Sequence, residues 1–288
     1  MRILGVAIAL LIGILLGDAG IIGGLRSSEA AAPADPSGQV FEEARLRRLT
    51  PTTPSDFTVG YYGDSFAFSA SEHAHHLLET GGRLNVVGAS FHGVAVCDLL
   101  SQMRTDVATH DMFGAILVFA GNSFTPCMAK ANGKQLSGQA SLRKFEADLT
   151  EAVRLFTADG ARVYLGTVPE ARLQAVLDIN WARDTNRVLA KVAKANRRVE
   201  LIDSAAAVLD ANGNYTETLP CLEFEPCMFG ERNLVRESTG IHFCTSGFAD
   251  VRVGIDTCPV WSSGAFRFAG AITAPVVEDA QKAWQRTG

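Results

Sequence analysis

The sequence has no excess of basic residues and no cysteine pattern typical of a metal site. Its 26 Lys and Arg are outnumbered by 31 Asp and Glu, which gives a formal net charge of −5. A nucleic-acid partner would require a basic face, and nothing in this balance indicates one. The chain contains neither a CxxC pair nor an internal repeat, and its cysteine spacings match no common zinc pattern.

What the sequence does contain is typical of a globular protein. Hydrophobic residues make up 47% of the 288 positions and charged residues 20%. This balance allows a buried core, and the length is sufficient for one large α/β domain with extensions.

The N-terminal residues have the features of an export segment. Arg2 is followed by an apolar run over residues 3–25, interrupted only by Asp18, and then by small residues over 28–32. Such an order is typical of a signal peptide, and about 20 apolar residues would also span a bilayer. We expect a signal peptide or membrane anchor at 1–26, a flexible tether at 27–54 and the folded domain at 55–288. The protein would then be secreted or anchored on the outer face of the cytoplasmic membrane.

Six cysteines are consistent with export. An even number of cysteines in an exported chain favours disulfides over free thiols. We expect three pairs, two closing local loops and one joining two longer segments: Cys221–Cys227, Cys244–Cys258 and Cys97–Cys127.

Short apolar runs alternate with amphipathic segments through most of the domain. The expected strands are 57–62, 84–88, 115–120, 162–167 and 199–203, and the expected helices are 66–79, 141–158, 180–196 and 262–284. This alternation predicts parallel strands that are covered on both faces. Residues 220–260 lack periodicity and are expected to form a disulfide-linked loop region, and Pro275 is expected to start or kink the last helix.

Four positions carry residues suited to acyl transfer. Ser65 ends the Gly63-Asp64-Ser65 turn between a strand and a helix, where amide groups at the helix N-terminus can stabilise an oxyanion. Gly88 ends the next expected strand, Asn122 follows the one after it, and His242 lies near the C-terminus. Because parallel sheets bind ligands at the carboxyl ends of their strands, Ser65, Gly88 and Asn122 are expected at one edge.

The order of these blocks resembles the SGNH (GDSL-type) hydrolase superfamily. The resemblance covers about Phe57 to Ala271. More specifically, the stretches 242–244 and 258–265 resemble exported actinobacterial SGNH domains related to those fused to membrane acyltransferases. It implies a flavodoxin-like three-layer α/β/α sandwich with a five-stranded parallel sheet. It also implies a Ser65 nucleophile, a His242 base, an oxyanion hole of Ser65, Gly88 and Asn122, and hydrolysis of acyl esters of carbohydrates or lipids. No metal or organic cofactor is required for this chemistry.

The sequence departs from the family pattern before the histidine. Thr239 stands where the family usually has the aspartate that orients the imidazole. Either the enzyme works as a Ser–His dyad with a backbone carbonyl orienting the ring, or a carboxylate such as Glu237 or Asp250 substitutes. A third alternative is a non-catalytic cell-envelope binding protein. An acyltransferase would use the same residues as a hydrolase, so the sequence does not separate the two.

Several other side chains are weaker candidates. His73 and His76 share one face of an expected helix and could bind a metal ion, although a solvated face is the simpler interpretation. His92 follows the second expected strand and could approach the site. Three phenylalanines adjoin the expected oxyanion residues and would form either an acyl pocket or part of the core: Phe66, Phe91 and Phe124.

Overall fold

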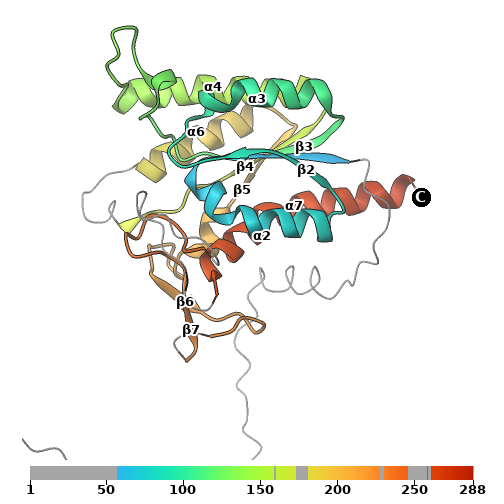
Figure 1. Ribbon diagram of the computed structural model, residues 1–288, viewed down its shortest axis with the longest axis vertical. Helices are drawn as coiled ribbons and strands as arrows, with labels where there is room; N and C mark the ends of the chain where they lie inside the picture. Colours follow the sequence, from blue (N-terminus) through green and yellow to red (C-terminus); the bar gives the residue numbers. More distant parts are fainter. Residues whose placement is uncertain are drawn as a thin grey trace, which may run out of the picture. The chain divides into compact units, whose positions relative to one another are not determined.

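A single parallel sheet forms the centre of the computed structural model (Figure 1). The structure describes residues 57–158, 160–172, 181–227, 230–245, 258 and 261–287. The expected export segment and tether, as well as Asp250, lie outside these residues. No helix within the described ranges is long and apolar enough to cross a membrane.

The sheet has five strands in the order β2-β1-β3-β4-β5, and all neighbouring strands are parallel. The strands are β1 (Thr58–Gly63), β2 (Asn85–Ser90), β3 (Met112–Val118), β4 (Arg162–Gly166) and β5 (Val199–Ile202). This is the flavodoxin-like strand order. It confirms the predicted fold class.

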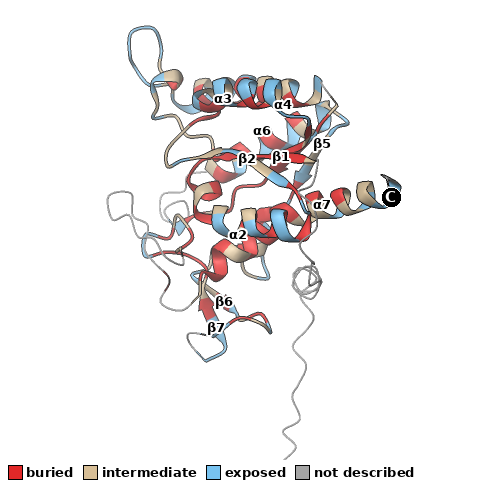
Figure 2. Ribbon diagram, turned by 45° about the vertical axis from the view of Figure 1, so that its right-hand side comes forward, coloured by how far each residue is buried: buried red, intermediate tan, exposed pale blue. Residues whose placement is uncertain are grey.

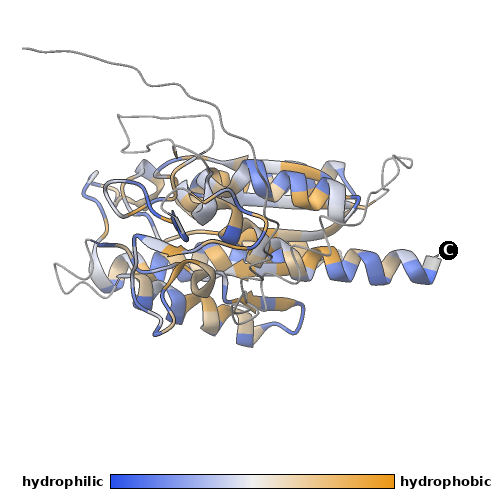
Figure 3. Cartoon of the chain, turned by 90° about the horizontal axis from the view of Figure 1, so that it is seen from below, coloured by the Kyte–Doolittle hydropathy of each residue, from blue (hydrophilic) through white to orange (hydrophobic). Residues whose placement is uncertain are grey.

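Helices cover both faces of the sheet (Figure 1). One face carries α2 (Ser65–Gly81) and α7 (Ser263–Thr287), and the other carries α3 (Val96–Thr109), α4 (Gly138–Ala158) and α6 (Trp181–Ala195). Pro275 lies inside α7 rather than at its start. The last turns of α7 are largely hydrophilic (Figure 3), whereas its earlier turns contribute buried apolar residues to the core.

Two adjacent tyrosines of β1 illustrate how the layers form. All six residues of β1 are buried, and the central strands lie inside the molecule (Figure 2). Successive side chains of a strand point to opposite faces. The Tyr61 hydroxyl accordingly donates to the carbonyl oxygen of Ala67 in α2 at 2.9 Å, and the Tyr62 hydroxyl donates to Asp106 in α3 at 2.6 Å. Each buried hydroxyl therefore ties β1 to a different helical layer.

Two kinds of element differ from the sequence-based expectation. A helix, α3, lies between the second and third strands, where none is predicted, and β6 (Thr218–Pro220) and β7 (Arg232–Leu234) form a short antiparallel pair where only loops are predicted. Two short 3-10 helices, η1 (Pro126–Met128) and η2 (Ser204–Val208), complete the described elements. The cysteines are paired as expected, as Cys97–Cys127, Cys221–Cys227 and Cys244–Cys258.

Candidate active site

The turn between β1 and α2 places Ser65 at the first position of α2. Gly63 permits the close passage of the chain, because a Cβ there would lie 2.3 Å from the carbonyl oxygen of Val118. Asp64 caps the helix by accepting a hydrogen bond from the backbone N–H of Phe66 at 3.1 Å. Ser65 thus lies at the positive end of a helix, where backbone amides are available to an anion.

Asp64 also ties this turn to the end of β3. Its Oδ2 accepts hydrogen bonds from the backbone N–H of Ala120 at 2.5 Å and from Asn122 Nδ2 at 3.1 Å. Burial raises the pKa of the Asp64 carboxyl to about 7, and the hydrogen bonds oppose this rise. The aspartate of the Gly-Asp-Ser turn therefore holds together the two chain segments that carry Ser65 and Asn122.

Asn122 lies at the predicted edge of the sheet, and its side-chain amide has protein partners. Nδ2 is 3.1 Å from Asp64 Oδ2 and 3.2 Å from the carbonyl oxygen of Val94. These two contacts use both amide hydrogens. The predicted role of Asn122 in an oxyanion hole therefore requires that one of these hydrogen bonds be exchanged for the substrate.

The predicted position of Gly88 at the end of a strand is wrong. Gly88 lies inside β2 opposite Tyr61, and the strand continues to Ser90 opposite Gly63. At Gly88 φ is 124°, and a Cβ would lie 2.4 Å from the carbonyl oxygen of Tyr61, so this glycine is needed for close backbone packing. The loop that follows β2 instead contains Gly93, which has a φ of 71° and open space around the position of a Cβ.

His242 lies against the first turn of α2. Its ring centroid is 5.9 Å from that of Phe66, the neighbour of Ser65, and 6.0 Å from that of His92. Burial lowers the pKa of His242 to about 4, and the nearby charge of Glu237 opposes this effect. A neutral imidazole is the form that can act as a base. No hydrogen bond joins Ser65 to His242 among the described residues, a looseness common to catalytic pairs without substrate.

Glu237 lies on the other side of the imidazole. Its Oε1 is 4.0 Å from His242 Nδ1, an atom without a hydrogen-bond partner among the described residues, and the Glu237 side chain is 0% exposed. The separation is longer than a hydrogen bond. The same carboxylate accepts backbone N–H groups from Thr239 at 2.6 Å, from Ile241 at 2.9 Å and from His242 at 2.9 Å. Glu237 therefore fixes the loop that carries the histidine.

Thr239 does not occupy the position of an orienting aspartate. Its hydroxyl donates to Glu237 Oε1, so its side chain supports the carboxylate. Of the three candidate orienting residues, Glu237 is the one with a carboxylate close to Nδ1 of His242 in the described part of the chain. The sequence signal for Glu237 was its position five residues before the histidine.

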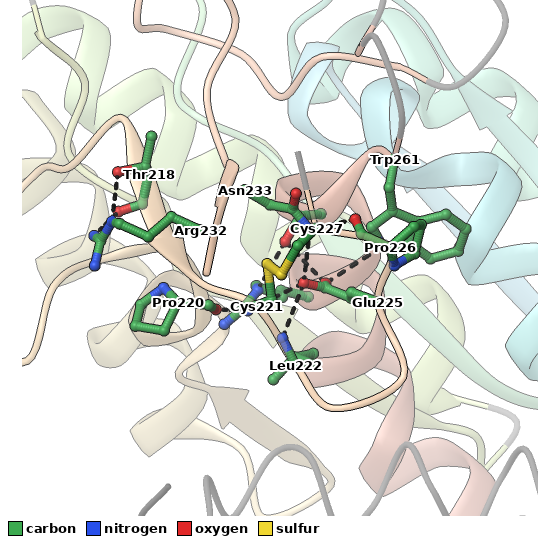
Figure 4. Close-up of polar contacts among 12 residues, drawn as sticks. Thr218, Pro220, Cys221, Leu222, Glu225, Pro226, Cys227, Arg232, Asn233 and Trp261 are labelled. Carbon is green, nitrogen blue, oxygen red and sulfur yellow. Dashed lines mark hydrogen bonds and ion pairs between the residues drawn. A yellow bond between two sulfur atoms is a disulfide. The ribbon is translucent and has the colours of Figure 1, made fainter. Parts of the chain in front are cut away.

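A second buried glutamate anchors the segment that leads to this loop (Figure 4). Glu225 accepts hydrogen bonds from Ser263 Oγ at 2.8 Å, Trp261 Nε1 at 3.3 Å and Asn233 Nδ2 at 3.2 Å. It also forms an ion pair with Arg267 of α7 at 3.4 Å. Because β7 contains Asn233 and is followed directly by the Glu237 loop, this network connects the start of α7 to the site. The sequence analysis did not single out Glu225.

The remaining candidates do not meet at this site. The His73 ring is hydrogen-bonded to Ser262 Oγ at 2.6 Å, and within the described ranges no group of three metal-ligating side chains is arranged to hold an ion. The expected apolar pocket of three phenylalanines is not formed as such: Phe66 is part of the core, whereas Phe91 and Phe124 are exposed. His92 does approach the site, through its ring contact with His242.

No protein-family model and no curated protein sequence matches this chain, whereas several solved structures are similar to it. A GDSL-like lipase from Bacteroides thetaiotaomicron is 13% identical, with 85% of this chain and 98% of that chain covered and a TM-score of 0.48. The C-terminal catalytic domain of peptidoglycan O-acetyltransferase A from Streptococcus pneumoniae is 13% identical, with coverages of 78% and 95% and a TM-score of 0.44. An acetylxylan esterase from Geobacillus stearothermophilus is 16% identical, with coverages of 54% and 79% and a TM-score of 0.40. The chain is thus similar to solved structures of GDSL-type hydrolases, the superfamily that its four sequence blocks resemble.

Proposed function

We propose that this protein is an exported serine esterase that hydrolyses acyl esters, with Ser65 as the nucleophile, His242 as the base and Glu237 as the orienting carboxylate. The observation that carries the proposal is the arrangement around His242. Its ring lies against the first turn of α2, which begins with Ser65, and its Nδ1 faces Glu237 at 4.0 Å. A nucleophile, a base and a carboxylate in this order constitute the triad logic of acyl transfer.

In the proposed reaction, Ser65 Oγ attacks the ester carbonyl while His242 Nε2 takes the hydroxyl proton. The tetrahedral oxyanion collapses to an acyl-serine, and His242 returns the proton to the departing alcohol. Water then attacks the acyl-serine, again with His242 as the base, which releases the acid and restores Ser65. Glu237 stabilises the imidazolium that forms in each half of the reaction.

We propose a set of oxyanion donors that differs from the one expected from the sequence. The backbone N–H of Ser65 remains available at the start of α2. We assign the second donor to the backbone N–H of Gly93, because the loop following β2 passes the catalytic edge, whereas Gly88 is paired inside the sheet. Asn122 would contribute a third donor after releasing Asp64 or Val94.

Export is supported by the three disulfides, since such bonds persist in oxidising compartments. We propose that the protein is secreted or held at the outer face of the cytoplasmic membrane by its N-terminal segment. Its substrate would be an ester of a carbohydrate or a lipid, and an acceptor hydroxyl in place of water would make the same site an acyltransferase.

A non-catalytic binding protein is the second candidate. It is favoured by the missing hydrogen bond between Ser65 and His242 and by the occupied amide of Asn122, as seen among the described residues. The two candidates differ in whether Ser65 forms a covalent intermediate.

The test is hydrolysis of p-nitrophenyl acetate by the full oxidised chain, with Ser65→Ala and His242→Ala as the disabled variants. Ser101→Ala and His76→Ala remove the same groups from exposed helix positions and serve as matched controls. We expect both site variants to lose activity by at least about 10³-fold, and both controls to retain it. A wild type no faster than Ser65→Ala, together with no labelling of Ser65 by a fluorophosphonate in mass spectrometry, would reject the esterase.

A further inference from the structure

Two phenylalanines are exposed at the catalytic edge of the sheet. Phe91 follows β2 and is 53% exposed, and Phe124 follows β3 and is 78% exposed. Among the described residues the other exposed large hydrophobic is Leu201 in β5, at 36%. Single exposed apolar residues need no explanation, but these two lie in loops that are hydrogen-bonded to the Gly-Asp-Ser turn and to each other, and such a pair indicates a surface for a ligand.

The loops that carry this aromatic pair, Phe91 and Phe124, are fixed to the site and to each other. The backbone N–H of Phe91 donates to the carbonyl oxygen of Gly63 at 3.2 Å, directly beside the Gly-Asp-Ser turn. The carbonyl oxygen of Phe124 accepts a hydrogen bond from Gln135 Nε2 at 3.2 Å. The backbone at both phenylalanines is therefore held in place by hydrogen bonds.

Two links join the loops across the edge of the sheet. Asn122 Nδ2 donates to the carbonyl oxygen of Val94 at 3.2 Å. The Cys97–Cys127 disulfide connects the start of α3 to η1, with 6.1 Å between the Cα atoms. Each link runs from one ring-bearing segment to the other. Pre-organised contact residues lose little entropy on binding, so such bracing favours a ligand-binding role.

We propose that Phe91 and Phe124 bind the alcohol part of the ester by stacking on a sugar ring, so that the substrate is an acylated carbohydrate. This inference rests on the proposed esterase function and selects between its carbohydrate and lipid substrates. A sugar ring has apolar C–H faces and a rim of hydroxyl groups, and an aromatic ring can cover such a face while the hydroxyls stay in water. An acyl chain gains most when apolar walls remove it from water on several sides. Rings that are 53% and 78% exposed fit the first ligand better than the second.

The first arm of the test compares substrates. Phe91→Ala and Phe124→Ala should each lower kcat/KM for O-acetylated xylohexaose or O-acetylated chitohexaose by about tenfold, a loss of roughly 1.4 kcal/mol. Their kcat/KM for p-nitrophenyl acetate should remain within about twofold of the wild type. Phe91→Trp and Phe124→Trp should retain activity on the oligosaccharide, and Leu201→Ala is the matched control for loss of an exposed apolar side chain. Equal losses on both substrates, or losses confined to p-nitrophenyl octanoate, would overturn the proposal.

The second arm does not depend on catalysis. Calorimetric titration of the Ser65→Ala chain with the same two oligosaccharides should show binding that each alanine substitution in the aromatic pair weakens by about tenfold. If the wild type proves inactive on every ester, this titration still tests the aromatic pair, so failure of the esterase and failure of the sugar site are distinguishable. The sugar site would be rejected if neither of the two oligosaccharides binds.

Discussion

Replacing Glu237 by glutamine removes one negative charge beside the proposed base with almost no change in shape. The side chain is 0% exposed, so water cannot substitute for the lost charge. The carboxylate accepts backbone N–H groups from Thr239, Ile241 and His242. In the native protein the backbone N–H of Thr239 donates to Oε2, and those of Ile241 and His242 donate to Oε1. A glutamine oxygen at the position of Oε1 would retain the last two hydrogen bonds. The glutamine NH₂ group at the position of Oε2 would face the Thr239 N–H, so that hydrogen bond would be lost.

The effect on catalysis follows from the 4.0 Å between Glu237 Oε1 and His242 Nδ1. Two unit charges at about 4 Å attract each other by about 4 kcal/mol at an effective dielectric constant of ~20. The imidazolium formed when His242 takes the Ser65 proton would lose this stabilisation, which corresponds to about 10³-fold in rate. Because the glutamine dipole retains part of it, we expect kcat/KM for p-nitrophenyl acetate to fall by about 10²- to 10³-fold. The acidic limb of the pH profile should also move down, since the charge of Glu237 raises the pKa of His242.

The measurement is kcat/KM as a function of pH for the wild type and Glu237→Gln, with folding verified by circular dichroism. Glu217→Gln is the matched control, because Glu217 is a half-exposed glutamate paired with Arg172 and should tolerate the change. A folded Glu237→Gln chain with kcat/KM within about threefold of the wild type would refute the orienting role. Asp250→Asn would then be the next substitution to measure.

Four further predictions concern His242, Thr239 and Glu225. Because burial lowers the pKa of His242 to about 4, the acidic limb of kcat/KM should lie near pH 4 rather than 6.5. The unfolded chain binds this proton more tightly, so the stability that His242 contributes above pH 6.5 should be lost as the pH falls toward 4, as urea unfolding would measure. Thr239→Asp should lower rather than raise activity in the ester assay, since it replaces a hydroxyl donor to Glu237 by a second carboxylate. Glu225→Gln should destabilise the chain to urea by about 3 kcal/mol, because it breaks a buried pair with Arg267.

Controls and opposing outcomes are available for the substitutions and for the kinetic profile. A wild-type p-nitrophenyl acetate profile with its acidic limb near pH 6.5 and none near pH 4 would contradict the lowered pKa of His242. Thr239→Ser keeps the hydroxyl and should remain active, and higher activity in Thr239→Asp would mean that the aspartate reaches the imidazole. Glu223→Gln, at an exposed position beside the Glu225 network, should leave the unfolding free energy unchanged. A loss of less than about 1 kcal/mol in Glu225→Gln would show that the pair is dispensable.

The sheet was predictable because of how parallel strands are buried. Strands covered on both faces are continuous apolar runs, and Ala115–Val118 in β3 is such a run, fully buried in the structure. The missed α3 buries Val96, Leu99 and Met103 at a helical spacing, but its N-cap position, Ala95, provides no side-chain cap to mark where the helix begins. The missed β6–β7 pair is short, and much of its order comes from Glu225, whose partners lie up to 42 residues away in the chain. Contacts at that separation leave no local pattern.

The residues of the site also differ in whether a local sequence pattern is enough to locate them. Ser65 comes shortly after the end of β1 at Gly63, and Asn122 shortly after the end of β3 at Val118, so the strand pattern locates both at the carboxyl edge. The position of Gly88 depends on register: β2 continues two residues beyond it, to Ser90 opposite Gly63, and pairing alone determines this. Glu237 was one of several carboxylates near the histidine in sequence, and what distinguishes it is a tight loop that folds its buried carboxylate back onto the N–H groups of the segment carrying His242. A polar side chain can be assigned to chemistry from sequence when it follows a regular element, whereas a group positioned by loop closure needs the three-dimensional path of the chain.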